Sequence, residues 1–139
     1  MANGLYQHGV KHFARGNILW LASGGTSIKA HLVDTADYAV DLANHEFRDA
    51  SGLTAASGRE EDSGAMTLVD AAVDGVCDAN DVTFVGTSGD ACEGILVAHD
   101  SGADATSRLI AWWDSASGLP VTLGGDVTVT WNASGLFKI

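Results

Sequence analysis

The fold class can be inferred from one segment near the C-terminus, Gly125-Asp126-Val127-Thr128-Val129-Thr130-Trp131. Its apolar side chains, Val127, Val129 and Trp131, alternate with threonines. This period of two residues is typical of an antiparallel strand with one buried face and one face in solvent.

Similar short segments occur along most of the chain, and glycine and aspartate clusters such as Asp74-Gly75 separate them. Such residues favour turns, so each segment reads as one strand of an antiparallel sheet. Besides 126–131, the pattern predicts strands at 17–22, 28–33, 65–73, 82–85, 92–98, 108–113 and 136–139. Segments 17–22 and 28–33 are expected to form a hairpin.

Strands at this spacing, without alternating helices, predict a mainly β protein and argue against a parallel α/β fold. We expect a single β-sandwich or jelly-roll-like antiparallel domain over residues 1–139. A chain of this length has room for one domain and for a hydrophobic core that needs no disulfide.

The pattern at the N-terminus differs, because residues 4–15 show helical periodicity. Tyr6, Val10 and Phe13 share one face, which we expect to be buried against either the chain's own sheet or a neighbouring subunit. Gly16 follows as a C-terminal cap. The opposite face carries four basic side chains that we expect in solvent: His8, Lys11, His12 and Arg15.

Two segments show neither period. Residues 36–47 are rich in aspartate and predict a polar connection with a helical turn near 42–47. Residues 48–64 are mostly small or polar and predict a long exposed loop.

Composition excludes several classes of partner. The chain has 7 Lys and Arg against 18 Asp and Glu, for a formal charge of −11, and no two of these cations are adjacent. Nucleic acids and anionic membranes both require a basic surface, so neither is expected as a partner. No apolar run approaches the ~20 residues of a membrane span, and the first eight residues lack the pattern of a secretory signal.

No motif predicts a cofactor or a metal, and calcium bound by scattered surface aspartates is the alternative. Cys77 and Cys92 are expected to be buried, reduced thiols, with a disulfide between neighbouring strands as the alternative. His45-Glu46 begins like a zinc-protease helix, but Asp49 occupies the position of the second histidine. His8 and His12 have the i, i+4 spacing of metal ligands, yet Lys11 and Arg15 beside them disfavour a cation.

No spacing predicts an enzyme either. Gly86-Thr87-Ser88-Gly89-Asp90 differs from the serine-nucleophile motif in its last residue and lies between strands. His99 and Asp100 are adjacent, so on a strand their side chains would point to opposite faces.

Trp112-Trp113 is the most unusual dipeptide. Its two rings should point to opposite faces of a strand. One is expected in the core, and the other covers a loop or strand, faces a subunit interface, or forms a platform for a sugar.

Several segments resemble small virion proteins of tailed bacteriophages. They are residues 28–38, residues 81–84 with the following Ser88-Gly89-Asp90, residues 109–122 and residues 125–131. The resemblance covers most of the chain, is weakest near 55–64, and supplies no catalytic residues.

The resemblance implies a capsid decoration (cement) protein on the outside of a phage head. Such a protein binds the major capsid protein, acts as a homo-oligomer such as a trimer, and is made in the host cytoplasm. Its expected assembly contacts are Tyr6, Val10, Phe13, Trp112 and Trp113. The alternatives are a phage tail or fibre subunit and a carbohydrate-binding module.

Overall fold

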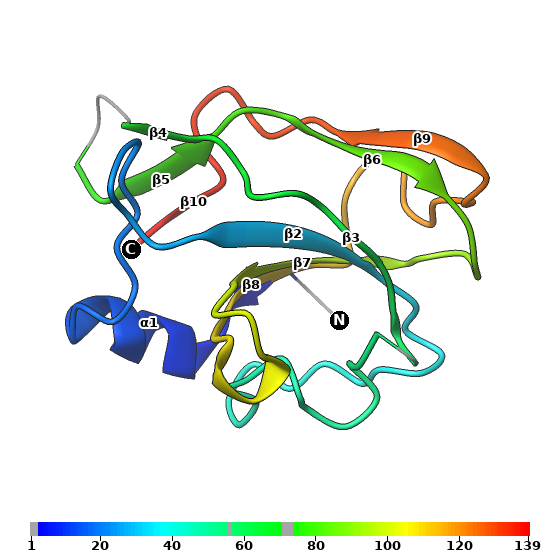
Figure 1. Ribbon diagram of the computed structural model, residues 1–139, viewed down its shortest axis with the longest axis horizontal. Coiled ribbons are helices and arrows are strands. Elements are labelled where there is room, and N and C mark those ends of the chain that lie inside the picture. Colours follow the sequence, from blue (N-terminus) through cyan, green and yellow to red (C-terminus); the bar gives the residue numbers. More distant parts are fainter. Residues whose placement is uncertain (1–2, 56, 71–73) are drawn as a thin grey trace.

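The computed structural model describes residues 3–55, 57–70 and 74–139, and it centres on a five-stranded antiparallel sheet (Figure 1). The order of its strands is β1 (Gly4–Leu5), β8 (Leu109–Trp113), β7 (Gly94–His99), β2 (Ile28–Val33) and β3 (Arg59–Asp62). All of these pairings are antiparallel, with Ala30 opposite Val97 and Leu96 opposite Trp112.

Two smaller antiparallel sheets form a layer over one face of the central sheet (Figure 1). One has the order β10 (Phe137–Lys138), β5 (Val76–Ala79) and β4 (Leu68–Asp70), and the other pairs β6 (Val82–Thr87) with β9 (Gly125–Val129). Helix α1 (Gln7–Ala14), the segment after β2 and the short 3₁₀ helix η1 (Asp104–Thr106) lie on the opposite side. The predicted mainly β, sandwich-like antiparallel fold with a short N-terminal helix is therefore confirmed.

The central sheet has a hydrophobic core on each of its faces. Successive side chains of a strand point to opposite sides, so the three middle strands β8, β7 and β2 contribute residues to both cores. On β2 and β7, Ala30, Leu32 and Val97 join the hydrophobic core shared with the two small sheets. Leu96 and Ala98 join a second core with Tyr6, Tyr38 and Trp112, beneath the segment after β2. A one-residue irregularity between β7 and β8 places Ile110 in the first core.

Helix α1 is shorter than the predicted 4–15. Gly4 and Leu5 instead pair with Trp112 and Ala111 of β8, so the chain enters the helix from a strand. The predicted cap at Gly16 is present: its φ of 73° is in the left-handed region, and its N–H donates to the carbonyl of Phe13.

Three strand predictions need correction. Residues 17–22 form no strand, and β2 pairs with β7 and β3 rather than with them. The predicted strand 65–73 is reduced to β4, and its last three residues lie outside the described residues. The pattern also missed β5, a four-residue strand that contains the polar Asp78.

Of the predictions for the two irregular segments, the one for 48–64 needs correction. Residues 36–47 form a connection of turns, and the N–H of His45 donates to the carbonyl of Asp41 at 3.0 Å, an i, i+4 bond like that of a helical turn. Segment 48–64 contains β3, and the buried Arg48, Leu53 and Arg59 show that it is no fully exposed loop. No helix among the described residues is long and apolar enough to cross a membrane.

Candidate functional site

The five expected assembly contacts have very different surroundings. Tyr6 and Trp112 are completely buried, so neither side chain can contact another subunit in this fold. Val10 is 37% exposed, so it is not buried against the sheet of its own chain, and its burial by a neighbouring subunit stays a prediction. Phe13 and Trp113 are partly buried against the first core. The expected contacts at the surface are therefore reduced to Val10, Phe13 and Trp113.

Trp112 and Trp113 differ in burial: Trp112 is completely buried, and Trp113 is partly buried. Trp112 packs edge-on against Tyr38, with ring centroids 5.6 Å apart, and its indole N–H donates to Asp114 at 2.9 Å. Trp113, on the opposite face of the sheet, packs against Trp131 at 5.4 Å. Trp112 therefore cannot serve as a platform for a sugar, and Trp113 presents only part of its surface.

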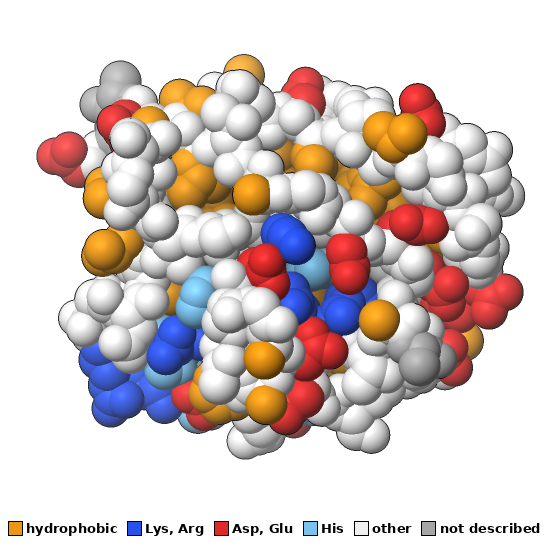
Figure 2. All heavy atoms as spheres, in the orientation of Figure 1, with side chains coloured by type: hydrophobic (Ala, Val, Ile, Leu, Met, Phe, Trp, Pro, Cys, Tyr) orange, Lys and Arg blue, Asp and Glu red, His pale blue; other side chains and the backbone are white. Residues whose placement is uncertain are grey.

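Large apolar side chains are exposed at one end of the molecule, in the segment that follows α1 and at the last residue of the chain. Leu19 and Leu21 are each 47% exposed and flank Trp20, whose ring packs on Phe137 of β10 at 5.3 Å. Ile139, two residues beyond Phe137, is 50% exposed. Figure 2 shows hydrophobic side chains at the surface of this end. We call Leu19, Leu21 and Ile139 the apolar end.

A groove of about 430 Å³ follows the strand from which the fold class was inferred. The β9 groove, as we call it, is lined by residues 127–132 and 116–119, and by Trp113 and Leu136. Leu32 and Ile95 of the central sheet also line it, so it opens onto the first core. No lining residue is ionisable, which makes the groove suited to an apolar, uncharged ligand.

A network of charged side chains lies over the opposite side of the central sheet, near the middle of the face in Figure 2. Arg48 donates to Asp104 at 2.7 Å and to Asp100 at 3.1 Å, and Arg59 donates to Asp104 at 2.9 Å. Both arginines are buried. Their pairing fixes segment 48–64 and η1 to the sheet.

His31 extends this network into the sheet. Its Nδ1 lies 2.7 Å from Oδ1 of Asp62, while burial lowers its pKa against the opposing effect of the Asp62 carboxylate. The His31 side chain is completely enclosed, and its ring also faces Arg48. Since the ring cannot reach a substrate in solution, the network is better suited to holding the fold than to proton transfer.

His12 and His45 each belong to a sequence pattern that resembled a metal site, and each has a side-chain partner within the protein. His12 is buried, against the prediction of a solvated face, and lies 2.7 Å from Glu46, which lowers the pKa of that carboxyl. His45 Nδ1 lies 2.8 Å from the hydroxyl of Tyr38, which is itself 2.9 Å from that of Tyr6. These contacts fix residues 38–46 to α1 and the core.

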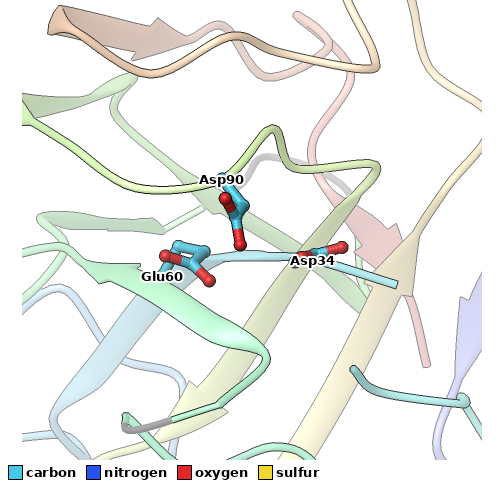
Figure 3. Close-up of side chains that lie close together, drawn as sticks. All are labelled: Asp34, Glu60 and Asp90. Carbon is cyan, nitrogen blue, oxygen red and sulfur yellow. The ribbon is translucent and has the colours of Figure 1, made fainter. Parts of the chain in front are cut away.

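Three carboxylates from separate segments converge at the other end of the central sheet (Figure 3). Oxygens of Asp34, Glu60 and Asp90 all lie within 4.8 Å of one another. Burial, followed by the charges of Asp90 and Asp34, raises the pKa of Glu60. Such oxygens suit a hard cation, although Ca²⁺ takes six to eight of them. No motif pointed to this cluster, because no two of its members are near in the chain.

Comparison with known proteins adds no relative: the chain matches no model of a protein family, and no curated protein matches it.

Proposed function

We propose that this chain is a non-enzymatic virion structural protein, a capsid decoration protein that binds the outside of a phage head. The sequence resemblance to small virion proteins suggests the class of particle, and the apolar end supports a role in binding. In this proposal the protein bridges neighbouring major capsid subunits and strengthens the shell against the pressure of the packaged DNA.

The apolar end is the observation that carries the proposal. Leu19, Leu21 and Ile139 expose about half of their surface, which is costly for a protein that stays alone in water. A stable interface buries about 800 Å² on each partner, roughly an eighth of the 6632 Å² surface of this chain. The apolar end would supply the centre of such a contact.

The charge of the chain is compatible with this position. A formal charge of −11 keeps a free subunit soluble, and it disfavours contact with packaged DNA. Because the contacts would be mainly apolar, binding should depend only weakly on salt. Several copies, as a trimer for example, would spread the contact over a site formed by more than one shell subunit.

The experiment compares binding of the purified protein to expanded shells and to free capsid subunits by co-sedimentation. We expect strong binding to shells and weak binding to free subunits. The double variant Leu19→Asp, Leu21→Asp should bind shells at least tenfold more weakly. Val85→Asp is the matched control, because Val85 is 77% exposed on β6 and lies outside the apolar end.

Imaging of intact particles provides the second measurement. Copies of this chain on the outer surface of the head are expected, and particles that lack it should lose DNA more readily on heating. Density confined to the tail would support a tail or fibre subunit instead, and absence of the chain from virions would refute a structural role.

A further inference from the structure

In the second layer, β9 is one of the strands that pair on one side only, as β6, β4 and β10 also do among the described residues. β9 pairs with β6 on one side, and no other strand of the described residues pairs with its second edge. Such an edge presents free peptide N–H and C=O groups to a further strand. Proteins commonly protect it with lysine or proline, and β9 contains neither.

The β9 groove runs along this free edge. Val127, Thr128 and Val129 of β9 all line it, as do residues 130–132, which follow the strand. Because side chains of a strand alternate between faces, a groove on one face of β9 would contact only every second residue of the strand. Contact with three consecutive strand residues places the groove beside the backbone of β9. Three extended residues span about 10 Å, so the edge has room for a short extended segment.

The chemistry of the groove indicates what would fill it. Its lining contains no ionisable side chain, so it offers no ion pair to a charged ligand, and its polar side chains are Ser117, Thr128, Thr130 and Asn132. The buried indole N–H of Trp131 has no hydrogen-bond acceptor, an arrangement that calls for a partner. An extended polypeptide would supply carbonyl acceptors for the edge and apolar side chains for the groove at alternate positions.

We propose that the β9 groove binds an extended, uncharged segment of a partner protein by strand addition to β9. The segment would carry apolar side chains at every second position and no proline at its centre. This inference goes beyond the decoration role, since it concerns a different surface from the apolar end and holds for any partner with such a segment.

The test uses a defined probe and the intact protein. The probe is a nonapeptide of alternating threonine and valine with a lysine at each end, and its counterpart is N-methylated on alternate amides. Amide and indole NMR signals of the protein report binding at about 1 mM peptide, the range of weak complexes. We expect shifts in residues 127–131 and in the Trp131 indole, and at least tenfold weaker binding of the methylated peptide.

Variants separate this site from the apolar end. Thr130→Arg, at an exposed position of the groove, should weaken peptide binding at least tenfold, whereas Leu21→Asp should leave it unchanged. No shifts with the peptide, or equal binding of both peptides, would overturn the inference. Tighter binding of a linear glucose hexasaccharide at the same signals would also overturn it, in favour of a sugar site. None of these outcomes depends on shells, so they leave the decoration proposal to its own test.

Discussion

The Nε atom of Arg48 donates a 2.7 Å hydrogen bond to Oδ1 of Asp104, a residue 56 positions later in the chain. Arg59 donates to the same carboxylate oxygen at 2.9 Å, so Asp104 joins two buried guanidinium groups. Through these bonds the segment after β2 and η1 are joined to Arg59 of β3, the edge strand of the central sheet.

Replacing Arg48 with methionine should strongly destabilise the protein. The change removes the hydrogen bonds of Arg48 to the partly exposed Asp104 and Asp100 carboxylates. Each carboxylate keeps another cation, and loss of hydrogen bonds to charged groups costs about 1.5–3 kcal/mol. Chemical denaturation measures the loss in the free energy of unfolding. Arg15→Met, at the exposed C-cap position just after α1, is the control and should change stability by less than about 0.5 kcal/mol. Equal effects of the two changes would contradict the prediction.

The buried His31 should make stability depend on pH. Burial, with the charges of Arg59 and Arg48, lowers its pKa in the folded state despite the opposing effect of Asp62. As pH falls below about 6.5, the unfolded chain takes up a proton that the folded chain does not, so stability should decrease. Denaturation at about pH 7.5 and about pH 5.5 measures the difference.

The variant His31→Gln identifies the source of this pH dependence. It should reduce the loss of stability between the two pH values, and His99, whose pKa burial also lowers, should account for part of the remainder. The pKa of Glu60 is raised in the folded state, so its protonation at lower pH should increase stability and oppose the effect of His31. Wild-type stability that increases on acidification over this range would refute the role of His31.

The sequence was sufficient for the fold class because the period of two survives wherever a strand is half-buried. Val127, Val129 and Trp131 pack against the first core while Thr128 stays exposed, as the pattern predicts. The pattern failed at residues 17–22, where Leu19 and Leu21 are exposed. An apolar run forms a strand only if another strand pairs with it. Here β2 pairs with β7 and β3, which are distant in the chain, and so leaves residues 17–22 without a partner strand.

The candidate sites were harder to predict because they join distant segments. Segment 48–64 looked polar and irregular, yet its arginines are buried because Asp62, Asp100 and Asp104 surround them. The β9 groove depends on strand order, since periodicity does not show which edge of a strand stays unpaired. His12 was predicted to be in solvent because a helical wheel shows only the residues of the helix. Its partner Glu46 belongs to a later segment of the chain.

The two cysteines should react slowly in the folded protein. Both are free and buried, as predicted, and burial raises the pKa of Cys77 to about 11 and that of Cys92 to about 12. The thiolate is the reactive form, so a chromogenic disulfide reagent at about pH 8 should modify them only after denaturant is added. Rapid modification of the native protein, or a melting temperature that falls in reductant, would contradict this prediction.

Gly9→Ala should destabilise the protein although alanine favours helices. In an exposed helix this change typically contributes about 0.5–1 kcal/mol of stability. Here a methyl group on Gly9 would overlap the carbonyl oxygen of Leu109 and lie 3.1 Å from Cα of Ile110, because α1 packs directly on the β8 backbone. Since backbone atoms cannot rotate away, the helix must move off the sheet.

Overpacking of this kind costs about 1–3 kcal/mol, more than the gain in helix propensity. The denaturant midpoint of Gly9→Ala should therefore fall, and an unchanged slope of the transition would show that the denatured state is the same. Val10→Ala, at the next position of the helix and 37% exposed, is the matched control and should shift the midpoint far less. A higher midpoint for Gly9→Ala would mean that α1 does not lie against β8, and the burial of Tyr6 at the start of the helix would then also be in doubt.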